Sequence, residues 1–513
     1  MPEPRQPRRS KTPKDVAPKQ LTFDLPGAEF VFGVVAAVGT DTSGVKAALE
    51  TTLKRFGYTP KIIRISDFLA EFDLGIPLLE SSEYERINTR MDAGNAACRR
   101  AGRNDFLALA ACAKISSDRT TQAGSERREP RSKTAQILMT LKRPEEVLAL
   151  RRIYGTGFLL IGVFATEEER LHHLVKEVGM TQEQAEELIR RDRNEADPHG
   201  QGTRDTFHLA DVFVRAAKDE YKDQLVRFVD LLFGHPFHTS TRDEHGMFLA
   251  FAGSLRSADL SRQVGAAILS ERGEVIGIGC NDVPQAGGGL YGPDENDQRD
   301  HIIGYDTNEE RRNEMVADIV ARLLPNIPPA ERVKEGLQLL KESPLLDITE
   351  FGRAVHAEMD AILAVARTGA GARGATIYST TFPCHNCTRH IIAAGIKRVV
   401  YIEPYPKSKA QDLHADAISI EEHAHKAHAT TLENRVSFES FVGVGPRRYA
   451  DLFATTLASG KKIVRKEKGK RVAWTHVVAT PRVPMLPTSY LEREQLASAQ
   501  IEAMMHQLHH EEE

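Results

Sequence analysis

The first clear pattern along the chain is an apolar, β-branched run over residues 29–38 that breaks at Gly39-Thr40-Asp41. Such a run predicts a buried strand that enters a glycine turn. Helical spacing follows over residues 44–56, and residues 60–65 supply another short apolar run. Strand, loop, helix and strand in this order predict a parallel α/β fold for the N-terminal part of the chain.

The same alternation continues beyond a polar stretch over residues 116–133, which shows no periodicity and predicts a surface loop. The pattern then predicts a strand, a helix and a strand at 135–141, 144–154 and 158–164. Acidic helical segments follow up to about residue 191. We therefore expect one α/β domain over residues 26–235.

A second pattern begins with an apolar-periodic helix near Glu244. It predicts a hairpin of 263–269 and 275–280, then a helix, a strand, a helix and a strand at 354–368, 375–381, 385–394 and 398–402. This order predicts a sheet covered by helices over residues 240–460. A charged insert at 292–347 interrupts it, and an extension with a terminal helix from about Tyr490 occupies 461–513.

Composition limits the classes of function. The chain has 513 residues, a net charge of −4 and a pI near 6.6, which does not favour a protein that coats nucleic acid or an anionic membrane. Five cysteines in this length exclude a disulfide framework. Five prolines and six Lys or Arg in the first twenty residues predict a disordered basic tail over 1–25. With no signal-like or spanning apolar run, we expect a cytoplasmic protein without a membrane segment.

The strongest chemical motif is His356-Ala357-Glu358, followed by Pro383-Cys384-His385-Asn386-Cys387. One imidazole and two thiolates leave a fourth position of a tetrahedral Zn²⁺ for water, as a hydrolytic site requires. Glu358, two residues after the histidine, can act as the proton carrier. His-x-Glu followed by Pro-Cys-x-x-Cys is the zinc deaminase signature. We therefore predict His356, Cys384 and Cys387 as metal ligands and Glu358 as the catalytic residue.

Two other readings of these residues stay open at this point. A structural zinc knot would need a fourth ligand, for which His385 and His390 are near in sequence. A redox pair of cysteines would not need the His-x-Glu motif.

The approach to this motif carries a family resemblance. Residues 256–266 contain Arg-Ser-x-Asp and Val-Gly-Ala, and residues 277–284 read Gly-x-Gly-x-Asn-x-x-Pro, so this stretch resembles deoxycytidylate deaminases. The resemblance implies a cytidine-deaminase-like α/β/α fold, with Asn281 on the sugar hydroxyl and Ala357 presenting backbone groups to the cytosine edge. From the residues alone, Asn281 is also an ordinary turn residue.

The N-terminal turn occupies the place of a P-loop, between a buried strand and a helix. Gly39, Thr40, Asp41, Thr42 and Ser43 are candidates for nucleotide binding through backbone amides and the helix terminus, with ATP or GTP as the ligand. The lysine of a functional P-loop is absent, and Thr42 stands in its place. Residues 86–99 and the pair Arg190-Arg191 are further sources of positive charge.

A degenerate P-loop nucleotide-kinase-like domain fused to a deoxycytidylate-deaminase-like domain resembles the bacterial anti-phage dCTP deaminases over nearly the whole chain. The segments 90–95, 142–147, 207–213 and 441–449 resemble recurrent motifs of that family. The resemblance implies that the chain converts dCTP and dCMP to dUTP and dUMP, depletes dCTP during infection, and is restrained until then.

Three functions compete: a deaminase of free deoxycytidine nucleotides, a polynucleotide deaminase acting on tRNA or single strands, and a non-catalytic nucleotide sensor with structural zinc. The acidic balance and an aromatic content of 6% weigh against the second. We expect a homo-oligomer and an inhibitory or activating partner. The sequence does not assign triphosphate recognition, regulation or assembly to the insert.

Overall fold

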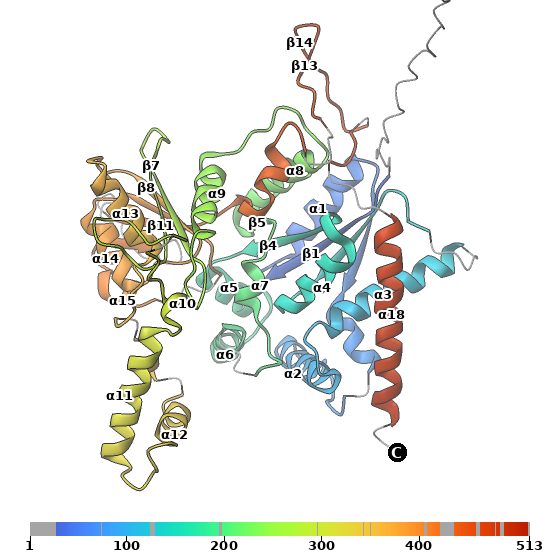
Figure 1. The fold of residues 1–513 in the computed structure, drawn as a ribbon. Helices are drawn as coiled ribbons and strands as arrows, with labels where there is room; N and C mark the ends of the chain where they lie inside the picture. The colour runs from blue at the N-terminus through green and yellow to red at the C-terminus, as the bar shows by residue number, and fades with distance from the viewer. Residues whose placement is uncertain are drawn as a thin grey trace, which may run out of the picture.

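A computed structural model describes residues 27–510, except 73, 124–128, 194–196, 295, 342, 349, 405–407, 421–434, 458–461, 478 and 483–486. The predicted tail over 1–25 lies outside the described residues. The helices and strands form two α/β parts that lie side by side, each built on a six-stranded sheet (Figure 1). These two sheets, largely parallel and covered by helices, confirm the predicted fold class.

The first sheet has the strand order β12-β5-β4-β1-β3-β2. Its parallel strands are β1 (Phe30–Ala36), β2 (Thr59–Arg64), β3 (Thr134–Met139), β4 (Phe158–Phe164) and β5 (Val212–Arg215). β1 lies between β3 and β4, and its side chains are buried on both faces, as its unbroken apolar sequence predicts.

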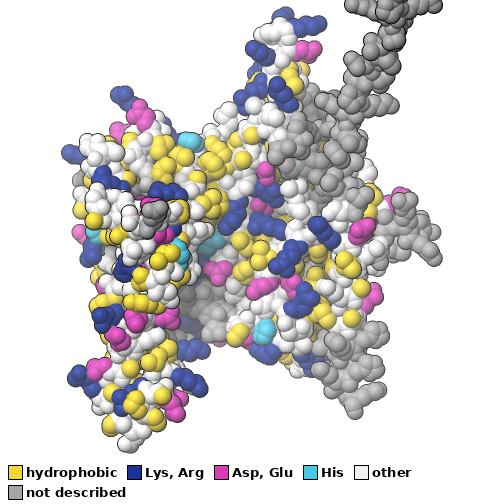
Figure 2. Space-filling view, in the orientation of Figure 1, with side chains coloured by type: hydrophobic (Ala, Val, Ile, Leu, Met, Phe, Trp, Pro, Cys, Tyr) yellow, Lys and Arg dark blue, Asp and Glu magenta, His cyan; other side chains and the backbone are white. Residues whose placement is uncertain are grey.

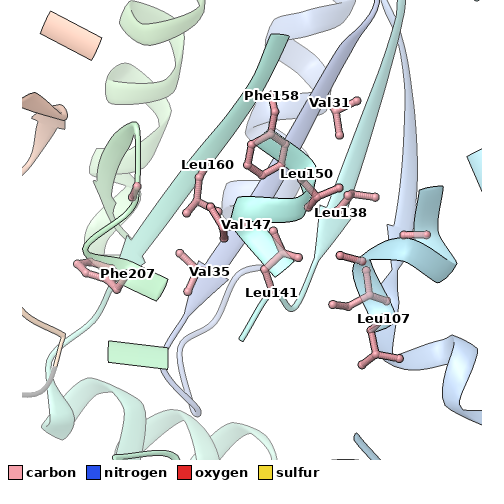
Figure 3. Close-up of a cluster of buried hydrophobic side chains, with 14 of the residues drawn as sticks. Val31, Val35, Leu107, Leu138, Leu141, Val147, Leu150, Phe158, Leu160 and Phe207 are labelled. Carbon is pink, nitrogen blue, oxygen red and sulfur yellow. The ribbon is translucent and has the colours of Figure 1, made fainter. Parts of the chain in front are cut away.

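One face of this sheet carries Val31 and Val35 of β1 together with Leu138 and Leu160 (Figure 3). They pack on Val147 and Leu150 of α4 (Pro144–Tyr154), and this core also includes residues of α3 (Phe106–Ala123) and α18 (Pro487–His510). The other face packs on α1 (Ser43–Arg55) and α8 (Glu220–Leu232).

The first part also contains α2 (Glu83–Ala101), α5 (Glu167–His172), α6 (Gln182–Arg193) and α7 (Thr203–Phe207). The surface loop predicted over 116–133 is wrong in its first part, because α3 continues to Ala123. Arg119 on this helix is buried and pairs with Glu29 at 2.6 Å and with Glu494 of α18 at 2.8 Å. The partner on α18 lies 375 residues away in sequence, so the local polar pattern gave no sign of burial.

The second sheet has the order β10-β11-β9-β8-β6-β7. The hairpin β6 (Gly265–Leu269) and β7 (Val275–Cys280) is antiparallel, whereas β8 (Thr376–Ser379), β9 (Arg398–Tyr401), β10 (Ile418–Ile420) and β11 (Val436–Ser440) run parallel. α9 (Arg242–Ser254) packs on one face, and α13 (Ala357–Arg367), α14 (His385–Ala393) and α15 (Ala410–His414) on the other.

The two parts share a boundary with buried contacts. Phe441, after β11, packs edge-on against Phe213 of β5 at 5.5 Å between ring centroids. The chain then returns to the first part: β12 (Gly443–Val444) pairs antiparallel with β5, and α18 packs near α3. Residues 443–444 therefore complete the first sheet, although they fall within the range 240–460 predicted for the second domain.

The insert forms α10 (Asp300–Ile303), α11 (Thr307–Leu323) and α12 (Arg332–Leu339), and the last two project as a pair away from the second sheet (Figure 1). α17 (Tyr449–Phe453) and the hairpin β13 (Lys466–Glu467) and β14 (Lys470–Arg471) precede α18. No helix among the described residues combines the length and the apolar content that crossing a bilayer needs.

Candidate metal centre

Three metal-binding side chains converge where two helices of the second part begin. His356 is the N-cap of α13, Cys384 is the N-cap of α14, and Cys387 lies in the first turn of α14. Their donor atoms all lie within 4.8 Å of one another, and among the described residues no other group of three His, Cys, Asp or Glu meets this condition. The structure thus brings together the three predicted ligands.

The donor set fits zinc. Nδ1 of His356 lies 3.3 Å from Sγ of Cys384 and 3.4 Å from Sγ of Cys387. Tetrahedral zinc with its usual bonds to sulfur and nitrogen would place such donors about 3.5 Å apart. His390, considered as a fourth ligand, is not part of the group, and its Nδ1 lies 2.6 Å from the Asn386 carbonyl oxygen. The described residues therefore supply a three-ligand set, which disfavours a structural knot.

Glu358 stands beside these ligands in the first turn of α13 and is only 3% exposed. Its Oε1 accepts a hydrogen bond of 2.8 Å from the hydroxyl of Ser379, at the end of β8. A buried carboxylate held by one hydroxyl keeps its other oxygen for a second partner. Ser379 was not predicted from the sequence, because no motif links it to a residue twenty-one positions away.

The electrostatics of the cluster favour a thiolate at Cys384, whereas the hydrogen bond with Cys384, burial and the nearby charge of Glu358 raise the pKa of Cys387. Hydrogen bonds from Cys387 and from His356 lower the pKa of Cys384 to about 4. The hydrogen bond with Cys384 raises the pKa of His356, the nearby charge of Glu358 adds to this rise, and the charge of Arg262 opposes it. Glu358 and Arg262 therefore both lie within electrostatic reach of the ligands.

Two glycines of β7 explain why α13 can place its first turn here. A Cβ on Gly279 would lie 2.3 Å from the amide nitrogen of Ala361 and 2.4 Å from the carbonyl oxygen of Ala357. A Cβ on Gly277 would lie 2.7 Å from the carbonyl oxygen of Ala361. Because these contacts are with backbone, only glycine permits the close approach. The Gly-x-Gly motif thus allows α13, the helix that positions His356 and Glu358, to pack directly on β7.

Asn281 and Ala357, predicted to contact substrate, lie at the same end of the sheet. Oδ1 of Asn281 accepts from the Val264 amide at 2.7 Å, and Nδ2 donates to the Arg262 carbonyl at 2.8 Å. One N–H and one lone pair of the carboxamide remain for a ligand. Ala357 is fully buried in the first turn of α13. Their contacts with substrate stay a prediction.

A cavity of about 390 Å³ opens between the two parts next to this site. Thr380 and Thr381 line it and directly follow Ser379. Arg262, which precedes β6, lines it from the second part, and Arg204 of α7 from the first. The sequence did not predict this cavity, since its walls come from segments far apart in the chain. Its other charged or titratable lining residues are Asp205, His208 and Arg447.

The turn after β1 is arranged differently from a phosphate-binding loop. The amide of Val38 donates to Oδ2 of Asp192 at 2.9 Å, and Lys142 pairs with Oδ1 of the same carboxylate at 3.1 Å. The Asp192 side chain is fully buried and also accepts from the hydroxyl of Thr203. A side chain of the protein therefore holds an amide at the start of the turn.

Of the five predicted residues, Gly39, Thr40, Asp41 and Thr42 lie between β1 and α1, and Ser43 is the first residue of α1. Gly39 has a φ of +87°, which favours glycine, and Asp41 caps the amide of Ser43 through Oδ1 at 2.8 Å. Thr42 is the N-cap of α1 without a side-chain hydrogen bond. Gly39, Thr40 and Thr42 line a cavity of the first part. Nucleotide binding by these residues stays a prediction.

Residues 240–403 match the family model described as the cytidine and deoxycytidylate deaminase zinc-binding region. The chain is similar to the deoxycytidylate deaminase of enterobacteria phage T2, with 49% identity over 55 residues, 11% of this chain and 29% of that enzyme. It is also similar to the mouse deoxycytidylate deaminase, with 27% identity over 159 residues, 31% of this chain and 63% of that enzyme. These matches span less than two thirds of either relative.

Among solved structures, the dCMP deaminase of cyanophage S-TIM5 in complex with dCMP and dUMP is similar at 16% identity and a TM-score of 0.21. The match covers 40% of this chain and 100% of that one. The matched range contains His356, Cys384 and Cys387, the three candidate metal ligands.

Proposed function

We propose that the chain is a zinc-dependent hydrolase that removes the cytosine amine from deoxycytidine nucleotides, dCTP and dCMP. The observation that carries the proposal is the convergence of His356, Cys384 and Cys387 beside the buried carboxylate of Glu358. Zn²⁺ bound by these residues would supply a Lewis acid that lowers the pKa of a water molecule. A site with three protein ligands leaves room for that water, which a closed structural site lacks.

The role of Glu358 follows from its position. Deamination adds water across the C4=N3 bond of cytosine, and the exocyclic C4–N4 bond then breaks with loss of ammonia. Protons must therefore move from the attacking oxygen to ring nitrogen N3 and to the departing nitrogen N4. A carboxylate in the first turn of α13 can take and return these protons. The hydroxyl of Ser379 fixes one oxygen of Glu358 and thus orients the other.

The cavity between the two parts supports a nucleotide with phosphates. Arg204, Arg262 and Arg447 line it, and guanidinium groups are well suited to phosphate oxygens. Arg204 also pairs with Glu403 at 2.7 Å across the boundary of the two parts. In Figure 2, Lys and Arg are interspersed with Asp and Glu over most of the visible face and gather on the projecting hairpin of β13 and β14.

The direct test is ammonia release from dCTP, dCMP and a short cytosine oligonucleotide, assayed side by side with zinc-loaded protein. The proposal expects release from the free nucleotides and none above background from the oligonucleotide. Release from the oligonucleotide alone would identify a polynucleotide deaminase. Zinc binding without release from any of the three would identify the non-catalytic sensor.

We further propose that this activity depletes dCTP during phage infection, as the resemblance to anti-phage deaminases implies. Cells that express the chain should lose dCTP and gain dUMP or dUTP after infection, and cells that express Glu358→Ala should not. Equal nucleotide pools and equal plaque counts in both would contradict the defence role. A homo-oligomer, a restraining or activating partner and a cytoplasmic location belong to the same proposal.

A further inference from the structure

The first part of the molecule contains its own cavity of about 270 Å³, remote in the fold from the metal centre. It lies beyond the carboxyl ends of β1 and β3, where ligands of open α/β sheets bind. Residues of the turn after β1, the end of β2 and the helix α2 enclose it. This cavity is not used by the proposed deamination.

Unsatisfied donors line one wall of the cavity. Nε and Nη1 of Arg90 are buried and have no hydrogen-bond partner, although Nη2 pairs with Glu80 at 2.8 Å. The hydroxyl of Thr40 is likewise buried without a partner. Arg64 also lines the cavity, is exposed and has no ion pair among the described residues. Buried donors without partners cost free energy, so the donors of Arg90 and Thr40 indicate an anionic ligand. Oε1 of Glu146, which lines the same cavity, is a buried acceptor without a hydrogen-bond partner.

The remaining basic residues of the cavity are already engaged. Arg143 donates to Oδ1 of Asn95 at 2.8 Å, and Arg86 is paired with Glu83 at 2.7 Å. Lys142 donates to the Ala36 carbonyl at 2.7 Å and pairs with Asp192. The free donors are therefore concentrated on Arg90, Thr40 and Arg64, which together provide enough hydrogen bonds for one phosphate group.

Apolar side chains also line the cavity and suit an organic group. They are Ile65, Leu69, Ile87, Met91, Leu107 and Met139. An apolar lining with a few convergent polar groups is the usual composition of a small-molecule site. The volume is near the lower limit of such sites, so the ligand must be compact.

From these observations we infer that the cavity binds a phosphate monoester of mononucleotide size, with the phosphate on Arg90, Thr40 and Arg64 and the base against the apolar side chains. A triphosphate is disfavoured, because the buried carboxylate of Asp192 already accepts from the Val38 amide at the start of the turn. The ligand thus lies in the cavity beside the turn, and the amides of the turn do not bind a triphosphate.

The test is calorimetric titration of the full chain with AMP, GMP, UMP and dTMP, with adenosine and Mg-ATP as comparison ligands. We expect at least one monophosphate to bind, and to bind more tightly than adenosine or Mg-ATP. Arg90→Gln and Thr40→Val should each weaken that binding, the first by about tenfold or more because a charge-assisted bond is lost. Arg322→Gln, a matched change of an exposed arginine on α11, should leave the affinity unchanged.

Several results would overturn the inference: no monophosphate binds, adenosine or Mg-ATP binds as tightly, or both cavity variants keep the full affinity. A pyrimidine monophosphate that binds at the metal centre would keep its affinity in Arg90→Gln. That result would also contradict the inference. Repeating the titration in Glu358→Gln keeps the test readable if the deaminase proposal fails, because the cavity does not depend on Glu358.

Discussion

The metal centre and the turn after β1 occupy comparable places in the two parts, since each lies where the chain enters the first turn of a helix. At the metal centre, His356 and Cys384 cap two helices, and Nδ1 of His356 lies 3.3 Å from Sγ of Cys384. In the turn, the backbone amide of Val38 is met by Asp192 of the same chain. One helix start thus gathers metal-binding side chains, and the other has an amide paired with a buried carboxylate.

The difference teaches that a motif's place in the fold does not decide its chemistry. The metal centre gathers one imidazole and two cysteine sulfur atoms, a donor set that suits zinc. In the turn, Asp192 supplies a negative charge to the Val38 amide, whereas the buried hydroxyl of Thr40 stays available for the ligand inferred above. The following variants test this contrast, from the largest expected effect to the smallest.

Replacing Glu358 should have the largest effect. We expect Glu358→Ala to keep zinc and fold but to lose deamination by several orders of magnitude, because general acid–base help alone contributes about 10²–10⁴-fold and Glu358 serves more than one proton step. Ammonia release and zinc content measured on the same sample check this. Turnover within tenfold of the unchanged chain would show that another group carries the protons.

Removing the internal carboxylate should destabilise the first part. Asp192→Ala leaves the ammonium of Lys142 and the amide of Val38 without their buried acceptor, so we expect the free energy of unfolding to fall by about 3 kcal/mol. Urea unfolding followed by circular dichroism measures this loss. Asp192→Asn, which keeps an acceptor for Val38, is the control and should cost less; equal stability of all three chains would mean that the turn is not closed by this contact.

A single methyl group on β7 should displace α13 and thereby disturb the metal centre. Gly279→Ala places a Cβ against the backbone of Ala361 and Ala357, and overpacking of this kind costs about 1–3 kcal/mol. Because α13 carries His356 and Glu358, ammonia release should fall with it. Gly371→Ala is the matched control, since nothing lies within 4 Å of a Cβ there and its φ is not positive. Equal activity of the two variants would show that close packing of α13 on Gly279 is not required for the metal centre.

The smallest effect is expected at the cavity between the two parts. Arg447 lines this cavity, and its guanidinium lies over the ring of Phe251 at 5.1 Å. Arg447→Gln should raise KM for dCTP by about fivefold, as expected for loss of one partly exposed charge contact, and should raise KM for dCMP less. Steady-state kinetics with both nucleotides decide this, and identical KM values for the variant and the unchanged chain would place the phosphates elsewhere.

The sequence predicted those features whose determinants are close together in the chain. The strands and helices of both parts follow from local periodicity; α4 and β4, for example, have the predicted bounds. The sequence predicted three candidate zinc ligands, which the structure brings together, and Glu358 beside them, because each motif fits within one helical turn and the chemistry limits the residue types.

What the sequence could not predict depends on contacts between distant segments. The sequence around Arg119 predicts an exposed loop, but Arg119 is buried and pairs with Glu494 of α18. Asp192 closes a turn 154 residues earlier, and Ser379 orients Glu358 from a neighbouring strand. Residues 443–444 join the first sheet although they follow the second, because a two-residue strand has no periodicity to recognise.

The central claim is that three side chains hold zinc and leave one position for water beside Glu358. X-ray absorption at the zinc edge of the loaded protein tests it most directly. The account predicts two sulfur atoms at about 2.3 Å and two nitrogen or oxygen atoms at about 2.0 Å, one of them from His356 and one from exchangeable solvent. A third sulfur, a second imidazole, or no bound zinc would contradict it.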